Sequence, residues 1–147
     1  MNDFYIEIIE ESVIENEEVT ARIKIGDFEE SFVLSLMFFT LKDYLSQWYS
    51  ALNALLKNQN SVALMYWLVP GNKKLFRRGW IFYKVGEIVY IQDRLFPTDF
   101  DEVTFDEMGI PTSIPKREIY TEEGDKISEW QTTLSDIYFF LESVNAI

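Results

Sequence analysis

Hydrophobic and polar residues alternate with a period of two along residues 19–36, with a Gly-Asp pair near the centre. Alternation of this kind is typical of strands that bury one face, and a Gly-Asp pair between two such runs indicates a tight turn. The pattern predicts a β-hairpin with a two-residue loop, in which Lys24 pairs with Glu29 on the exposed face. In the same register Glu30 stands opposite Ile23 on the apolar face.

Two other segments carry apolar residues at the three- and four-residue spacing of a helix that buries one face. The first spans about 40–57, where Thr40 and Asp43 resemble a capping box, and the second begins near Thr133, with Asp136 at the same distance. We expect both apolar stripes to lie in the core, and the polar residues of the first helix to take its other side. The stripes are Leu41, Tyr44, Leu45, Trp48, Leu52, Leu55 and Leu56, then Leu134, Ile137, Tyr138, Phe139, Phe140, Leu141 and Val144; the polar residues are Lys42, Ser46, Gln47, Ser50 and Asn53.

The rest of the chain divides into short strands and irregular segments. The predicted strands are 4–9, 61–68, 75–85 and 88–92; residues 122–125 are a predicted turn, 126–130 a short extended piece, and 96–116 a long irregular segment with its aromatic residues inward and its carboxylates outward. Runs of sequential strands beside a few helices favour the α+β class. We therefore expect one α+β domain over residues 1–147 with at least five antiparallel strands, and with Trp48 and Trp130 in its core.

Composition excludes much of the usual catalytic chemistry. The 147 residues include no cysteine and no histidine, so a disulfide framework, a Cys/His zinc site, a thiol nucleophile and a Ser-His-Asp triad are all impossible. The sequence has no Gly-rich phosphate loop and no nucleophile elbow. Asp99 and Asp101 are spaced like the start of a calcium loop, but the glycine and the glutamate that an EF-hand requires are missing. We predict no enzyme activity, no metal and no cofactor.

The ends and the apolar runs bear on localisation. No apolar run reaches the ~18 residues of a membrane span. The acidic N-terminus lacks the basic region with which a secretory signal begins. The expected location is the cytoplasm, with no contact to a membrane.

The net charge of −12 is distributed unevenly. Residues 1–36 carry ten acids and two bases, residues 37–97 three acids and eight bases, and residues 98–129 ten acids and three bases. Acidic blocks of this kind favour a cationic partner and disfavour direct binding of nucleic acid, whose phosphates require Lys and Arg. The candidate partner-binding residues are Asp99, Phe100, Asp101, Glu102, Phe105 and Asp106 in one patch, and Glu122, Glu123, Asp125 and Glu129 in the other.

Three motifs also resemble one known family. They are LKDYLSQWYSALNALL at 41–56, WIFYKVGEIVYIQDRLF at 80–96 and GDKISEWQTTLSDIYFFL at 124–141, in this order and at this spacing. The chain resembles the immunity proteins of bacterial contact-dependent growth inhibition systems, in the branch of the Enterobacter cloacae type. The resemblance covers about two-thirds of the chain, and its most specific part is the KISEW piece followed by a capped helix.

The resemblance implies a fold and a function. The fold is a curved antiparallel sheet with helices, similar to the Whirly single-stranded DNA-binding architecture. The function is to bind and block the C-terminal toxin domain of a cognate CdiA protein, a basic domain that in this branch is a nuclease, often an RNase. The resemblance carries over no site residue by motif, so the candidate residues above rest on charge and aromatic content alone.

Three alternatives remain open at this point. The first is an acidic nucleic-acid mimic that inhibits another DNA- or RNA-binding protein, which the neighbouring gene would distinguish. The second is a single-stranded nucleic-acid binder, which a filter-binding assay with RNA would test. The third is a carboxylate enzyme, such as a glycoside hydrolase, for which the sequence offers no positive feature.

Overall fold

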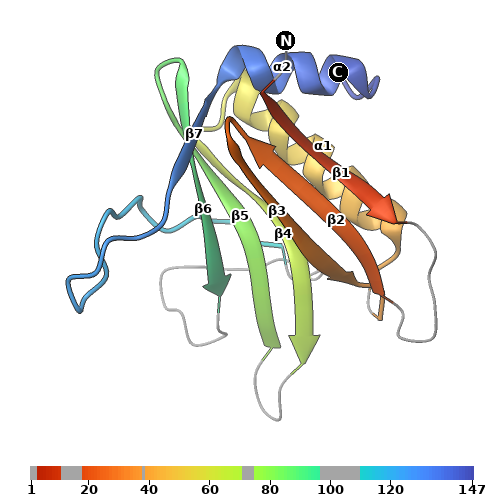
Figure 1. Cartoon of the computed structure of the whole chain (residues 1–147), viewed down its shortest axis with the longest axis horizontal. Coiled ribbons are helices and arrows are strands. Elements are labelled where there is room, and N and C mark those ends of the chain that lie inside the picture. Colours follow the sequence, from red (N-terminus) through yellow and green to blue (C-terminus); the bar gives the residue numbers. More distant parts are fainter. Residues whose placement is uncertain (1–2, 11–17, 38, 71–74, 97–109) are drawn as a thin grey trace.

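The computed structural model describes residues 3–10, 18–37, 39–70, 75–96 and 110–147. Within these ranges the chain forms seven strands and two helices, with the strands in two antiparallel sheets (Figure 1). The elements are β1 (Phe4–Glu10), β2 (Glu18–Ile25), β3 (Phe28–Ser35), α1 (Leu41–Lys57), β4 (Ser61–Pro70), β5 (Leu75–Val85), β6 (Ile88–Phe96), β7 (Trp130–Thr133) and α2 (Leu134–Ser143). The predicted antiparallel α+β class, the long helix and the C-terminal helix are confirmed.

The first sheet contains three strands in the order β1-β2-β3. Its hairpin has the predicted register, in which Lys24 faces Glu29 and Ile23 faces Glu30. Gly26 has a positive φ of 61°, a conformation that glycine adopts without strain, and this is why the two-residue turn falls at that position. Glu30 is exposed at the outer strand of this sheet, on the side of the second sheet.

The second sheet contains four strands in the order β4-β5-β6-β7. The short strand β7 pairs with the first half of β6, from Ile88 to Ile91. The sequence pattern indicated only an extended piece at 126–130 and missed β7, because four residues are too few to show a period. It also ended β6 too early, since that strand continues to Phe96.

Helix α1 closes the outer edge of β4 with two side chains. The Gln47 amide donates to the Ala63 carbonyl at 2.7 Å and accepts from the Met65 amide at 2.9 Å. The Trp48 indole donates to the Met65 carbonyl at 2.7 Å. Unpaired edge groups are thus satisfied without another strand. Gln47, which the sequence predicted on the side of α1 opposite the apolar stripe, is half-buried against β4.

The main core lies between the two sheets and the two helices. Members from every layer are essentially inaccessible to solvent: Phe4, Ile6, Ile23, Leu34, Trp48, Leu52, Leu64, Trp80, Phe82, Ile91, Ile137 and Leu141. Trp48 is a core residue, as predicted. Trp130, which was predicted in the core, is only half-buried at its edge. There it stacks on Phe28, at 3.9 Å between ring centroids.

A second, smaller core covers the opposite face of the four-stranded sheet. Side chains alternate between faces along a strand, so Ile81 and Tyr83 of β5 point away from the main core. Ile114 packs on this face, and the Tyr83 hydroxyl donates to the Pro115 carbonyl at 2.9 Å. Residues 110–118 therefore run across the outer face of the sheet.

Helix α2 lies across one end of the sheets (Figure 1). Ile137, Phe140 and Leu141 are buried, as predicted. Tyr138 and Phe139 are 43% and 53% exposed, so the prediction that they widen the buried stripe was wrong. Consecutive helical residues are separated by about 100° around the axis, which turns this pair toward solvent.

Candidate functional site

Residues 117–129 form a projecting segment, which we call the acidic arm. It leaves the outer face of the sheet beside β6 and returns to begin β7, at the left of Figure 1. Its two limbs pair through a bridge between Tyr120 and Lys126. The Thr121 amide donates to the Asp125 carbonyl, and the Ile127 amide donates to the Ile119 carbonyl, each at 2.8 Å. The arm is a small hairpin with a defined backbone.

The tip of the arm is a hydrogen-bonded turn. The Gly124 amide donates to the Thr121 carbonyl at 3.0 Å, and the Asp125 amide donates to the Thr121 hydroxyl at 3.1 Å. Gly124 has a φ of 90°, where a residue with a Cβ atom would be strained. The acidic turn predicted at 122–125 is therefore confirmed, with glycine at the position that requires it.

The base of the arm is fixed to the sheet by Glu129. Its carboxylate accepts two hydrogen bonds from the Arg117 guanidinium, at 2.8 and 2.5 Å, and one from the Gln92 amide at 2.7 Å. The same guanidinium lies 3.8 Å from the centre of the Tyr90 ring, a cation–π contact. Gln92 is fully buried and also donates to the Glu118 carbonyl. Both limbs of the arm are thus bound to β6.

The pKa of Glu129 reflects these contacts. The hydrogen bonds from Arg117 lower the pKa of the Glu129 carboxyl below its usual range; burial opposes this effect, and the bond from Gln92 adds to it. The pKa of Arg117 is raised by the same hydrogen bonds. Both side chains are therefore ionised at neutral pH. The pair is suited to holding the arm on the sheet rather than to transferring a proton.

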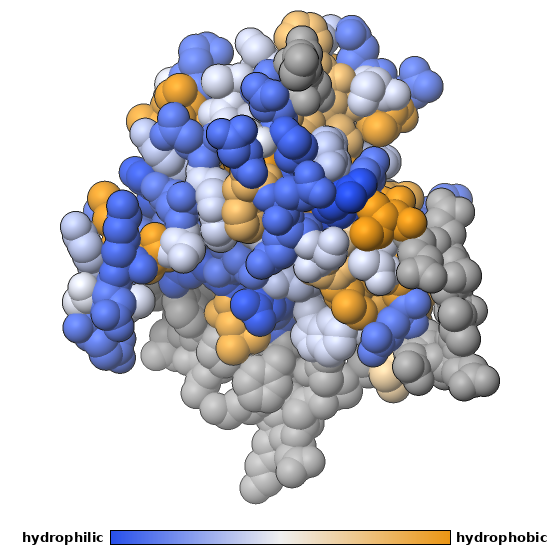
Figure 2. Space-filling view, viewed as in Figure 1, coloured by the Kyte–Doolittle hydropathy of each residue, from blue (hydrophilic) through white to orange (hydrophobic). Residues whose placement is uncertain are grey.

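The predicted binding residues have different positions in the structure. Glu122, Glu123 and Asp125 lie together at the tip of the arm, and all three are exposed. Glu129 lies at the base, where its side chain is 16% exposed and is bound to Arg117 and Gln92. The other patch, Asp99, Phe100, Asp101, Glu102, Phe105 and Asp106, lies outside the described residues. The surface of the arm is mainly hydrophilic with a few hydrophobic residues (Figure 2).

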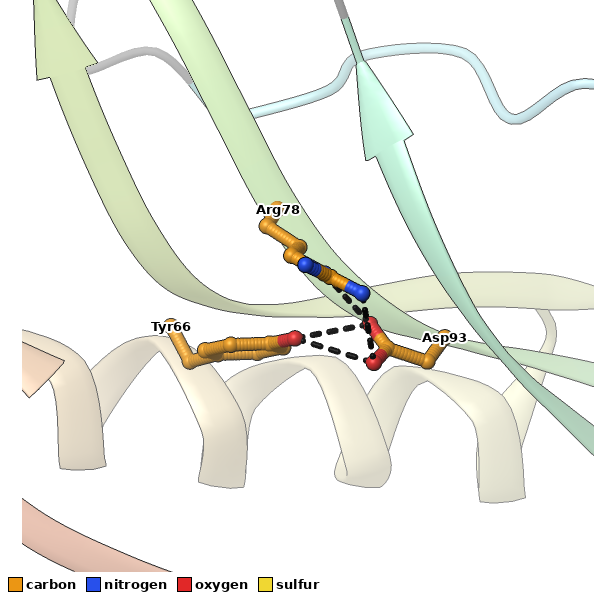
Figure 3. Close-up of polar contacts among 3 residues, drawn as sticks. All are labelled: Tyr66, Arg78 and Asp93. Atoms are coloured by element: carbon orange, nitrogen blue, oxygen red, sulfur yellow. Dashed lines mark hydrogen bonds and ion pairs between the residues drawn. The ribbon is translucent and has the colours of Figure 1, made fainter. Parts of the chain in front are cut away.

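A second polar cluster lies on the other face of the same sheet, one residue along β6. The Tyr66 hydroxyl donates its one proton to the Asp93 carboxylate, whose two oxygens lie 2.8 and 3.0 Å away, and Arg78 forms an ion pair with Asp93 at 3.3 Å (Figure 3). Burial is the main reason that the pKa of the Tyr66 hydroxyl is raised, and Asp93 adds to it. The hydroxyl therefore stays protonated and cannot serve as a nucleophile near neutral pH. The cluster connects β4, β5 and β6.

Two hollows of the described surface contain ionisable side chains. One, of about 330 Å³, lies between β3 and β4 over the Asp93 cluster, with Glu30 at its rim. The other, of about 550 Å³, lies between α1 and residues 110–114, and Asp43 is its one ionisable side chain among those described. Asp43 is occupied by the capping box of α1. No group of three or more metal-ligating side chains occurs within the described ranges.

Comparison with known proteins identifies the family. The family of the CdiI N-terminal domain matches residues 34–140, which is more than two-thirds of the chain. The chain belongs to this CdiI family. The immunity protein CdiI of Enterobacter cloacae subsp. cloacae is 32% identical over 123 residues, covering 84% of each chain. A chain of the CdiA-CT/CdiI toxin and immunity complex from Enterobacter cloacae has a TM-score of 0.77 and 29% identity, covering 98% of this chain and 99% of that one.

The CdiI match includes the structural features described above. It begins within β3 and ends within α2, so it contains α1, the whole four-stranded sheet and the acidic arm. The strands β1 and β2 lie before it, although the structural likeness extends over nearly the whole chain. No helix of the described residues is long and apolar enough to cross a membrane.

Several residues of this candidate site were not found from the sequence. Arg117, Gln92 and Tyr90 fix the arm, and nothing in their local pattern indicates a common partner. Ile119 and Tyr120 are 47% and 60% exposed on the arm. Their proximity to the acidic turn was the one available signal, since exposed aromatic residues beside charges are typical of protein interfaces.

Proposed function

We propose that this chain is an immunity protein that binds the C-terminal toxin domain of a cognate CdiA protein in the cytoplasm and neutralises it without catalysis. Membership of the CdiI family is the observation that supports this proposal most strongly. The similarity to a chain of a toxin and immunity complex, which extends over 98% of this chain, supports the same conclusion.

The charge of the acidic arm favours a basic partner. The acidic arm contains five acids and two bases, and one of those bases is neutralised by Glu129 at the arm's base. The three acids at the tip are exposed and lie on one turn, where they face solvent together. A surface of this kind attracts a basic domain at long range, and the attraction weakens as salt is added.

A nuclease would present such a basic surface. An enzyme that acts on RNA or DNA needs a cationic surface to hold phosphates. An acidic inhibitor can occupy the same surface, so neutralisation would follow from simple occlusion of the substrate. We propose accordingly that the cognate toxin is a nuclease, and that this chain does not bind nucleic acid directly.

The proposal is tested with the CdiA C-terminal domain that we expect to be encoded by the gene directly upstream of this chain's gene. Expression of that domain alone should arrest growth of the host cell, and co-expression of this chain should restore it. Purified toxin should degrade RNA or DNA, and an equimolar amount of this chain should stop the reaction. Continued growth arrest with the folded chain present would refute the function.

The electrostatic part has its own test, in the association rate at several salt concentrations. Reversal of Glu122, Glu123 and Asp125 to Lys should lower k_on by ~10-fold or more at low salt and flatten its salt dependence. Reversal of Asp99, Asp101 and Glu102 tests the other acidic patch in the same way. The matched control reverses three exposed acids elsewhere, Glu18, Glu87 and Glu142, which changes the net charge equally. Equal effects in all three variants would assign steering to net charge alone.

A further inference from the structure

Tyr120 is the most exposed tyrosine of the chain. All eight tyrosines lie within the described residues; six are buried or half-buried, while Tyr120 is 60% exposed and Tyr138 is 43% exposed. Among the described residues, the Tyr120 ring has no aromatic, cationic or hydrogen-bonding partner, whereas Tyr138 lies against Phe139 at 6.0 Å between ring centroids. A large aromatic ring left in water has lost the free energy that its burial would supply.

The backbone holds Tyr120 in place before any partner arrives. Tyr120 lies opposite Lys126 in the arm. The pair is flanked by two backbone hydrogen bonds, from the Thr121 amide to the Asp125 carbonyl and from the Ile127 amide to the Ile119 carbonyl. In such a non-hydrogen-bonded pair the two side chains stand closest on one face of the hairpin. Arg117 and Glu129 fix the limbs to β6. A preordered tyrosine with two side-chain torsions costs little conformational entropy on binding.

The charges around Tyr120 determine what kind of surface it fits. Glu118, Glu122, Glu123 and Asp125 are exposed within five residues of it. Three bases are also near: Arg117 is paired with Glu129, while Lys116 and Lys126 are exposed, so the acids remain in excess. An apolar protein surface would leave these carboxylates buried without partners, which is costly. A basic surface pairs with them and also offers cations to the face of the ring. A second copy of this acidic chain would be repelled.

We propose that Tyr120 is the aromatic anchor of the toxin interface and that it packs against a basic side chain of the CdiA toxin domain while the surrounding carboxylates pair with neighbouring bases. The proposal rests on the function proposed above and adds a division of roles. The acids of the arm set the rate of association, and the buried ring sets the lifetime of the complex. Interfaces commonly depend on a few central aromatic residues within a polar rim.

The experiment measures k_on and k_off for the upstream-encoded toxin domain with three variants. Tyr120→Ala should raise k_off by ~30-fold or more, as for an interface hot spot, and leave k_on within ~3-fold. Tyr120→Phe keeps the ring and should stay within ~5-fold of the parent chain. Tyr138→Ala removes an exposed tyrosine of the same type on α2 and is the matched control, with no change expected in either rate.

The outcomes separate this inference from the function. If the parent chain binds and neutralises the toxin while Tyr120→Ala dissociates at the parent rate, the anchor is refuted and the function stands. If the parent chain does not bind the toxin, the function itself fails. As a control for folding, each variant should show the same thermal unfolding midpoint as the parent chain. Sedimentation of the free chain should give a monomer; a dimer abolished by Tyr120→Ala would assign the ring to self-association and overturn the proposal.

Discussion

The acidic arm and the main core place the same kinds of residue in opposite environments. Trp48 in the core is fully buried and donates its indole hydrogen bond to β4, whereas Tyr120 on the arm is 60% exposed. The core is stabilised by burial of aromatic and aliphatic area, while the arm is stabilised by backbone hydrogen bonds and one arginine–carboxylate pair. Under the proposed function, stability resides in the core and recognition in the arm, so substitutions should separate the two.

The largest expected effect is in the core. Trp48→Ala should lower the free energy of unfolding by about 3–5 kcal/mol, because it leaves a cavity and removes the bond to the Met65 carbonyl. Urea denaturation followed by circular dichroism measures the loss. The control is Tyr120→Ala, for which about 0.5 kcal/mol or less is expected, as for most surface substitutions. A similar loss in both variants would contradict the separation.

Trp130 lies between the two extremes and sharpens the comparison. It stacks on Phe28 and meets Trp80 edge-on at 6.1 Å, yet it is only half-buried. Trp130→Ala should cost about 2–3 kcal/mol, below the full range for a buried aromatic residue. Denaturation measures this value, and Trp130→Phe should recover part of it. A loss above that of Trp48→Ala would place Trp130 fully in the core.

A smaller loss of stability than for either tryptophan is expected at the base of the arm. Glu129→Gln should lower the free energy of unfolding by about 1–2 kcal/mol at neutral pH, because the ion pair with Arg117 is replaced by weaker hydrogen bonds. The folded pKa of Glu129 is lowered, so this contribution is present above the ordinary pKa of Glu, about 4.3, and is lost as the pH falls through the folded value. Unfolding of both chains from pH 7 to pH 3 should show the difference shrink. A constant difference over that range would contradict the assignment.

Much of the fold could be predicted because it depends on local periodicity. The hairpin register of β2 and β3, the capping box at Thr40 and the buried stripe of α1 follow from the side-chain spacing of strands and helices. The strand β7 and the exposure of Tyr138 could not be predicted. A four-residue strand exists because β6 offers an edge to pair with, and the direction of α2 depends on what packs against it.

The candidate site also combines features set by the local sequence with features set by tertiary contacts. The sequence by itself determined the acidic turn, the glycine within it and the concentration of charge, because these are properties of neighbouring residues. Only the tertiary structure decided that Glu129 lies inward on Arg117 and Gln92 while Glu122 and Glu123 remain in solvent. The pairing of Glu129 with Gln92 joins residues 37 positions apart, and no local pattern encodes a contact at that distance. Whether a carboxylate stabilises the fold or stays available to a partner depends on whether the fold places a cation beside it.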